Sequence, residues 1–192
     1  MNEPARMVGA RAVGPAARPG CRAFTLIEIL VTVVILGIAG AMVIPAMGET
    51  GILRIQGAVR SIIADMTFAQ ADAVAFQERR AVMFDVANNN YRLVQVPGTT
   101  LDASSNTMYD PTRASGQFVM SLSDPRFGGA RLVSASFDNE PNIIFDPMGG
   151  PVADPAGATP GNGGTVVISG LNQVFTISVE PFTGRVTVTK TP

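Results

Sequence analysis

The sequence has no histidine, no tryptophan and a single cysteine, Cys21. Histidine and cysteine are the commonest metal ligands and the commonest bases and nucleophiles of enzymes, so the usual catalytic and metal sites lack their residues here. Cys21 precedes a long apolar run, and the chain beyond that run contains no thiol. That part cannot form a disulfide, so its stability must come from packing alone.

Carboxylates are the remaining candidates for chemistry. Four of them lie close together in sequence: Asp138, Glu140, Asp146 and Asp154. Calcium takes oxygen ligands from loops, but this set lacks the regular alternation and the closing glutamate of a calcium loop, so a solvated acidic loop is the preferred interpretation. The sequence also has no serine in a nucleophile elbow and no glycine-rich phosphate loop after a strand. We therefore expect a protein that is not an enzyme and has no metal or cofactor.

Basic residues are concentrated at the N-terminus. Residues 1–23 contain four arginines and one glutamate, a net charge of +3, whereas the remainder sums to −4. The segment is rich in Ala, Gly and Pro and has no apolar periodicity, so we expect a disordered leader. By the positive-inside rule this end stays in the cytoplasm, and the C-terminal part crosses the membrane.

Residues 24–47 form an apolar run with one charge, Glu28. A helix needs about 20 apolar residues to cross a bilayer, so residues 24–48 are predicted to span the membrane. A charge inside such a helix costs about 2.5–3.5 kcal/mol and usually has a partner or a function. A secretory signal peptide cut at Ala39-Gly40-Ala41 and a plain membrane anchor both explain the apolar run, but neither gives Glu28 a function.

The start of the apolar run carries a distinctive pattern: a basic residue, a small residue and then Phe-Thr-Leu-Ile-Glu-Ile-Leu-Val. This pattern resembles the type IV prepilin signal. The resemblance implies cleavage between Ala23 and Phe24 by a prepilin peptidase and N-methylation of Phe24. It also implies a filament in which Glu28 pairs with the N-terminal amine of a neighbouring subunit. Glycine usually precedes the cut in such signals, so with Ala23 we expect slower processing.

Gly37, Gly40 and Pro45 interrupt the apolar run. Proline removes a backbone donor, and glycine adds backbone freedom. In pilin-like proteins such residues let the helix unwind during filament assembly, and the resemblance implies the same function here. The alternative is a membrane helix that ends near Gly48.

Residues 49–80 continue as an amphipathic helix, bent relative to the first half and ending near Gln77. Its apolar stripe has helical spacing and comprises Ile52, Ile55, Val59, Ile62, Ile63, Met66, Ala69, Ala73 and Val74. The charged residues are expected off this stripe, at Arg54, Arg60, Asp65, Asp72 and Glu78. The simplest function for the stripe is packing on a sheet.

Residues 81–192 are predicted to form a β-rich domain. Alternating apolar residues indicate a hairpin, three shorter strands and a C-terminal meander. The expected strands are 81–86, 91–96, 117–122, 131–137, 142–145, 165–169, 173–180 and 185–189. Residues 97–116 are expected to form a long surface loop, and residues 151–164 a flexible excursion.

Three segments of the domain resemble the GspH/FimT-type minor pseudopilins and pilins: 60–74, 144–149 and 183–186. The resemblance implies an α+β, pilin-like fold in which a long N-terminal helix, its first half spanning the membrane, packs on an antiparallel β domain of two sheets. The implied function is a structural subunit at or near the tip of a type II secretion pseudopilus. The alternatives are a FimT-like minor pilin for adhesion or DNA uptake and a plain signal-anchored periplasmic domain.

The resemblance also implies the partners and the location. The partners would be prepilin peptidase, other pseudopilins or pilins, an inner-membrane assembly platform and, before assembly, membrane lipid. The protein would cross the bacterial inner membrane once, with its N-terminus in the cytoplasm and its domain in the periplasm, and would then enter the filament. Nucleic acid is not an expected partner, because the chain beyond Met47 sums to −3. In addition, Gly184-Arg185-Val186-Thr187 lacks the second arginine of the DNA-binding pattern Gly-Arg-x-Arg.

Overall fold

The computed structural model describes residues 24–113 and 115–191, without the side chains of residues 42–50. The predicted leader and Ala23 lie outside the described residues. The chain divides into two compact units, Met1–Met42 and Val43–Pro192, which we treat separately. One long helix, α1 (Leu26–Phe76), contributes to both units.

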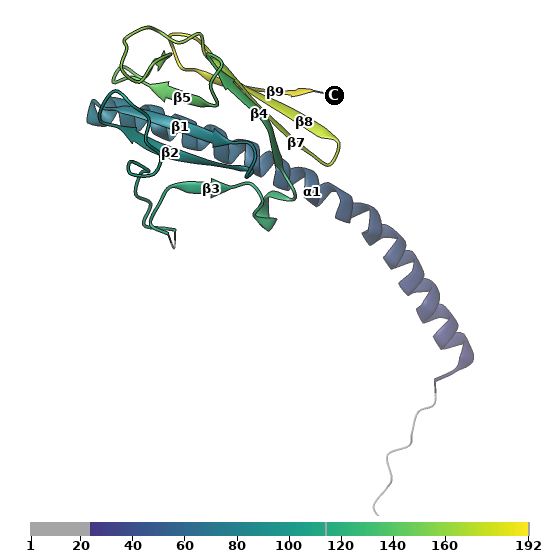
Figure 1. Cartoon of the computed structure of the whole chain (residues 1–192). Helices are drawn as coiled ribbons and strands as arrows, with labels where there is room; N and C mark the ends of the chain where they lie inside the picture. The colour runs from purple at the N-terminus through teal and green to yellow at the C-terminus, as the bar shows by residue number, and fades with distance from the viewer. Residues whose placement is uncertain (1–23, 114, 192) are drawn as a thin grey trace, which may run out of the picture. The chain divides into compact units, whose positions relative to one another are not determined.

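The second unit, hereafter the domain, contains two antiparallel sheets (Figure 1). The first sheet has the strand order β3-β2-β1-β5-β6, and the second has the order β4-β7-β8-β9. Their bounds are β1 (Arg79–Asp85), β2 (Asn90–Val96), β3 (Val119–Ser121), β4 (Arg131–Phe137), β5 (Asn142–Phe145), β6 (Pro151–Val152), β7 (Gly164–Gly170), β8 (Gln173–Val179) and β9 (Val186–Thr191). A short 3-10 helix, Pro125–Phe127, precedes β4. The predicted α+β fold with two sheets is confirmed.

Tight turns connect some of the strands that follow one another in sequence, β1 with β2 and β7 with β8. β1 and β2 pair from Arg79↔Val96 to Asp85↔Asn90, which confirms the predicted hairpin. β7 and β8 are joined by Leu171 and Asn172, whose φ angles are 47° and 58°. Two consecutive residues with positive φ produce the turn that best matches the twist of a hairpin. The predicted meander of β7, β8 and β9 is likewise confirmed.

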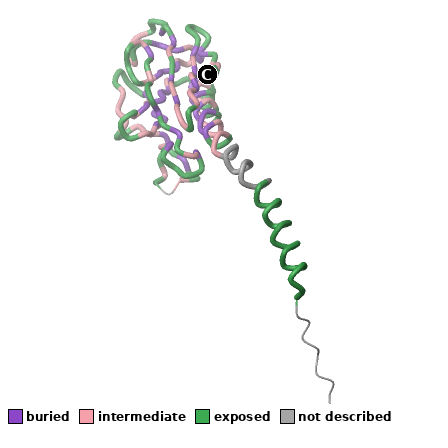
Figure 2. The backbone as a smooth tube through the Cα atoms, turned by 90° about the vertical axis from the view of Figure 1, so that its right-hand side faces the viewer, coloured by how far each residue is buried: buried purple, intermediate pink, exposed green. Residues whose placement is uncertain are grey.

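The domain part of α1 packs its predicted apolar stripe against the sheets (Figure 2). Its fully or nearly fully buried side chains are Ile55, Ala58, Val59, Ile62, Met66, Ala69 and Ala73. They share one hydrophobic core with residues of both sheets, including Phe145 and Ile177. The domain part of α1 therefore contributes to the core, as the pattern predicted, except at Val74, which was predicted on the stripe but is 43% exposed.

The opposite face of the first sheet has its own apolar cluster. Ala81, Val94 and Ile144 are buried there, and Leu101 and Ala103 of the predicted long loop pack against them. Successive residues of β1, Ala81 and Val82, thus belong to different clusters, because successive side chains of a strand point to opposite faces. The first sheet is covered by α1 on one face and by the loop on the other.

Helix α1 ends one residue earlier than predicted, at Phe76. Gln77 follows with φ 55°, and the Glu78 N–H donates to the Ala73 carbonyl oxygen at 3.3 Å. A left-handed residue followed by this long-range bond is the Schellman motif, which normally uses glycine. Gln77 occupies the position instead, and its side-chain amide donates to the Val74 carbonyl at 2.7 Å.

Two sequence predictions need correction. Asp65 and Asp72 were expected off the buried stripe, but both are partly buried because each binds a buried partner, Tyr91 and Arg80 respectively. The predicted flexible excursion contains β6 and is tied to β1. There, Arg79 donates from Nη1 to the Pro155 carbonyl at 2.7 Å and from Nη2 to the Gly157 carbonyl at 2.9 Å.

Candidate functional site

The first turn of α1 is closed by Thr25. Its side-chain Oγ1 accepts from the Glu28 N–H at 3.3 Å. Its carbonyl accepts from the N–H groups of Glu28 at 3.1 Å and Ile29 at 3.2 Å. Thr25 is therefore the N-cap residue, which satisfies a backbone donor that the helix start leaves free.

Glu28 lies three residues after this cap, where the positive end of the helix dipole favours a carboxylate. Sequence reasoning placed Glu28 near the helix start but missed the cap. The signal was present as Thr-x-x-Glu ahead of an apolar run, which is the capping-box pattern. Glu28 thus has a local function in starting the helix, in addition to any function between subunits.

The described side chains from Phe24 to Ala41 are all exposed. Phe24, which is predicted to become the N-terminus, is 74% exposed, and the large apolar residues after it are exposed as well. An apolar surface this extensive is rare on a soluble monomer and indicates burial against lipid or against other chains. Among the residues that the structure describes, no helix combines the length and the apolar character needed to cross a membrane.

The residues predicted to loosen the helix lie within the bounds of α1. A Cβ atom added at Gly37 or Gly40 would meet no other group within 4 Å. Neither glycine is therefore required by close packing inside one chain. Pro45 also falls within the helix bounds, but its side chain lies outside the described residues. Loosening of the helix at these three positions stays a prediction.

Three of the four carboxylates weighed as calcium ligands, Asp138, Asp146 and Asp154, accept hydrogen bonds from the protein itself. Asp146 Oδ1 accepts from the N–H groups of Met148 at 2.9 Å and Gly150 at 2.8 Å. Asp138 Oδ1 accepts from the Asn162 side-chain amide at 2.7 Å. Within the described residues, no three acidic, histidine or cysteine side chains are grouped to hold a metal ion.

The three segments that carry the family resemblance meet at one point of the domain. Gln70 Nε2 donates to the Gly149 carbonyl at 2.6 Å and to the Thr183 carbonyl at 3.1 Å. Gly149 and Gly184 have φ angles of 86° and 63°. A Cβ atom on Gly184 would lie 2.7 Å from the Gly149 oxygen. Gln70 therefore clips the β5–β6 turn and the β8–β9 turn to α1. The sequence pattern did not predict that these three segments would meet.

Two polar pairs lie beneath the helix. Tyr91 donates its hydroxyl to Asp65 Oδ2 at 2.5 Å, and burial raises the pKa of both groups. Arg80, which is 3% exposed, donates from Nε to Asp72 Oδ2 at 2.5 Å and also pairs with Glu78 at 3.1 Å. Buried groups paired in this way hold elements in register and leave no free nucleophile.

Comparison with known proteins gives two findings. The profile described as the prokaryotic N-terminal methylation motif matches residues 18–44. The solved structure of the minor pseudopilin EpsH from the Type 2 Secretion System of Vibrio cholerae is similar in fold, at 11% sequence identity and a TM-score of 0.49. That similarity covers 71% of this chain and 96% of the other. No curated protein matches significantly by sequence.

The matched residues 18–44 include the predicted cut, the capped first turn and Glu28. Beyond them, α1 continues into a domain whose helix packs on two antiparallel sheets. The chain therefore carries the prokaryotic N-terminal methylation motif on a helix that leads into a domain of two antiparallel sheets.

Proposed function

We propose that the protein is a minor pseudopilin of a type II secretion system, a structural subunit assembled at or near the tip of the pseudopilus. The observation that carries the proposal is the methylation motif over residues 18–44. Within this motif, Glu28 lies in the capped first turn of an apolar helix whose described side chains are exposed. The subunit is not an enzyme. It is cut after Ala23, methylated at Phe24 and then built into a filament.

Glu28 is the residue on which assembly depends. Isolated charges are costly in an apolar bundle, whereas a carboxylate that meets a neighbour's N-terminal amine gains an opposite charge in a medium of low dielectric constant. Because the pair forms only in one register, it selects the position of each incoming subunit. The exposed apolar side chains around Glu28 support burial against other helices after assembly and against lipid before it.

The choice of a secretion filament over a DNA-binding pilus depends on charge and on the domain. The chain beyond Met47 has a net charge of −3, and its single lysine is Lys190. Binding to phosphates requires a basic surface, which this composition does not supply. The resemblance of the Gln70-clipped segments to GspH/FimT-type proteins supports the minor subunit. The leader would remain in the cytoplasm and the domain would lie in the periplasm, with the inner-membrane assembly platform and other pseudopilins as partners.

The first test is the mature N-terminus, measured by mass spectrometry on the full chain expressed with and without prepilin peptidase. We expect a start at methylated Phe24 only when the peptidase is present. The variant Ala23→Gly should be processed faster, since glycine is the usual residue before the cut. A start at Met42, or an intact leader in both strains, would show that the chain is a secretory protein or a plain anchor.

Glu28→Gln separates assembly from processing and from helix formation. Glutamine still fits the capping-box position, so the helix should form and the cut should proceed, whereas the charge pair is lost. We expect the processed variant to remain in the membrane and to be missing from sheared filaments. Thr25→Ala is the matched control, because it removes the cap, worth about 1 kcal/mol, and keeps the charge. Assembly of Glu28→Gln at the normal level would contradict the proposed function of the carboxylate.

The choice between a type II secretion system and a type IV pilus can be tested in a strain that carries both machines. Deletion of the gene should block release of secreted enzymes and leave DNA uptake and piliation unchanged. The reverse result would make the chain a minor pilin.

A further inference from the structure

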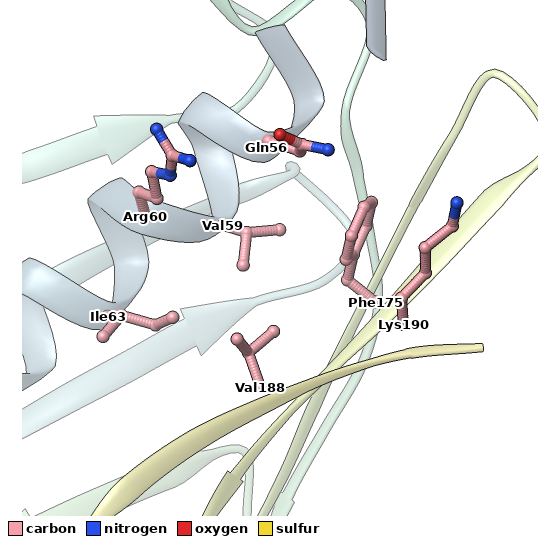
Figure 3. Close-up of a pocket in the computed structure, with 7 residues that line it drawn as sticks. All are labelled: Gln56, Val59, Arg60, Ile63, Phe175, Val188 and Lys190. Atoms are coloured by element: carbon pink, nitrogen blue, oxygen red, sulfur yellow. The ribbon is translucent and has the colours of Figure 1, made fainter. Parts of the chain in front are cut away.

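A groove runs between α1 and the β9 edge of the second sheet, within the domain (Figure 3). Val59 and Ile63 of α1 lie on one side, and Phe175 of β8 and Val188 of β9 lie on the other. The cavity measures about 250 Å³. Pockets for small molecules usually measure about 300–1,000 Å³, so this groove suits one or two side chains of another chain better than a cofactor.

β9 is an edge strand, and in the part of the chain that the structure describes its outer side has no neighbouring strand. It pairs with β8 over all six of its residues without a register shift, which leaves a regular outer edge. The other edge strand of this sheet, β4, has a register shift between Leu132 and Ser134. A bulge of that kind hinders further pairing, whereas a regular edge is a template for another strand.

The outward backbone groups of β9 belong to residues whose side chains face α1. The Glu180 N–H donates to the Arg185 carbonyl at 2.9 Å, so the pair nearest the turn is hydrogen-bonded. Bonded and non-bonded pairs alternate along an antiparallel ladder, so Val188 and Lys190 direct their N–H and C=O groups away from β8. The same two residues line the groove. A strand added at this edge therefore places alternate side chains in the groove.

The charged residues around the groove are both cations. Arg60 of α1 and Lys190 of β9 line it, and no carboxylate does. Among the described residues, neither cation has an acidic partner within ion-pair distance. An apolar floor beside two cations fits an added strand that directs an apolar side chain and a carboxylate toward α1.

A second copy of this chain does not match that description. Two β9 strands paired antiparallel through Val188 would bring the Arg60 and Lys190 side chains of both copies to one face of the joined sheet. Like charges would oppose this pairing. The predicted leader, residues 1–23, has a net charge of +3, which is also the wrong sign. The occupant is therefore expected from a different chain.

We propose that the β9 edge accepts an extended strand of a neighbouring filament subunit of a different kind. The strand pairs antiparallel with β9, as the other strands of this sheet pair with one another. Its apolar side chain lies between Val59 and Val188, and its carboxylate lies at Arg60 and Lys190. Because the donor is a different protein, the contact does not repeat from copy to copy, which suits a minor subunit at or near a tip. This inference rests on the proposed function and deepens it, since it names the surface that binds a neighbour and the chemistry of that neighbour.

The test uses the full-length chain in mild detergent and a labelled peptide, Thr-Glu-Thr-Phe-Thr-Val-Thr, as the probe. In an extended peptide the glutamate, phenylalanine and valine share one face, and the glutamate lies opposite Lys190 when the phenylalanine lies opposite Val188. We expect saturable binding, measured by fluorescence anisotropy. The control peptide, Thr-Thr-Glu-Phe-Val-Thr-Thr, has the same composition but places the phenylalanine on the face opposite to the glutamate. It should bind several-fold more weakly.

N-methylation of the peptide tests main-chain pairing separately from the side chains. In the antiparallel pair, the N–H of the residue opposite Val188 points toward β9, whereas the N–H groups of its two neighbours point away. Methylation of the phenylalanine nitrogen should therefore abolish binding. Methylation of the nitrogen of a neighbouring threonine is the matched control and should preserve most of the affinity.

Charge reversal in the protein supplies an independent readout. Arg60→Glu and Lys190→Glu should each weaken binding several-fold, and a peptide with lysine in place of glutamate should bind Lys190→Glu better than it binds the parent chain. Arg131→Glu, at an exposed arginine of β4, should leave the affinity unchanged. These changes keep the apolar side chains of the groove and of the probe in place.

The same variants test the contact in cells. Arg60→Glu and Lys190→Glu should be cut after Ala23 at the parent level but recovered in sheared filaments in several-fold smaller amounts, whereas Arg131→Glu should match the parent chain. Recovery of Lys190→Glu at the parent level would show that no neighbour needs this edge, and the inference would fail.

Three results with the peptides would also overturn it: equal affinity for the patterned and control peptides, binding that survives methylation of the phenylalanine nitrogen, or a dimer of the full chain, seen by light scattering, that the peptide dissociates. The dimer would show that a second copy occupies the edge. Peptide binding uses neither processing nor Glu28, so it can fail while the cut at Phe24 and assembly succeed. Absence of the parent chain from filaments would instead refute the proposed function.

Discussion

Asp65 and Tyr91 show what a single buried pair does for this domain. Tyr91 is fully buried and donates to Asp65 at 2.5 Å, which ties α1 to β2. Removal of the hydroxyl in Tyr91→Phe would leave the carboxylate without its partner and should lower the free energy of unfolding by about 1–3 kcal/mol. Sequence reasoning placed Asp65 with the solvent-exposed charges, because periodicity treats any charge as solvated and contains no information about a tyrosine 26 residues away.

The same pair predicts a pH dependence. Burial raises the pKa of Asp65 above its ordinary value of 3.8, partly offset by the bond from Tyr91. In the pH range between 3.8 and the raised pKa, the folded state binds more protons than the unfolded state, so this group lowers stability as the pH rises. Asp65→Asn removes the titration while it keeps an acceptor for Tyr91. We expect its stability relative to the parent chain to increase from pH 3.5 to pH 7, measured by urea unfolding. A difference that does not change with pH would contradict this prediction.

At the scale of elements, the alternation of apolar residues predicted the strands that pair with a neighbouring segment of the chain. The β1–β2 hairpin and the β7–β8–β9 meander pair neighbouring segments through short turns, so their alternation sufficed. β6 is two residues long, too short to show alternation, and it was missed. The Gln70 clip was also missed, because an uncharged amide that joins two distant turns leaves no periodic signal.

The same distinction applies to the candidate site. The methylation motif and Glu28 could be found from a contiguous stretch of sequence, and the capping box in that stretch could have been found too. The groove at Val59 and Val188 could not, because its two sides are brought together only by the fold.

Helix α1 gives a prediction about Gly37 and Gly40. Glycine is about 1 kcal/mol less favourable than alanine in a helix, and added Cβ atoms would meet nothing at either position within the chain. Gly37→Ala and Gly40→Ala should therefore increase helix content and slow amide hydrogen exchange in the apolar segment. If assembly requires a loosened helix, both variants should be cut normally after Ala23 but incorporated less into sheared filaments.

Gly98→Ala is the matched control for these variants, because its added Cβ also meets nothing within 4 Å but the residue lies outside α1. It should change neither processing nor incorporation. The predicted loosening would be contradicted if both helix variants showed slower amide hydrogen exchange and were still incorporated normally into filaments.

At the scale of the whole molecule, the chain combines two units that bury their apolar side chains in different ways. Residues 24–41 expose their apolar side chains and require lipid or other chains, whereas the domain has a buried core of its own. That core includes α1 residues from Ile55 onward, so the boundary between the two functions falls inside one helix. The domain should therefore fold without the apolar segment but not without the second half of α1.

Two truncated chains test this division. A chain of residues 51–192 keeps every helix residue of the core and should unfold in one cooperative transition, measured by circular dichroism. A chain of residues 79–192 lacks Ile55, Val59, Ile62 and Met66, each of which contributes about 1.5–3 kcal/mol when buried. Their summed contribution, roughly 6–12 kcal/mol, is as large as the net stability of a typical domain, about 5–15 kcal/mol. The shorter chain should thus expose both sheets and aggregate. A soluble, cooperatively folded 79–192 would show that the sheets do not need α1, and the buried stripe would then be free to act between subunits.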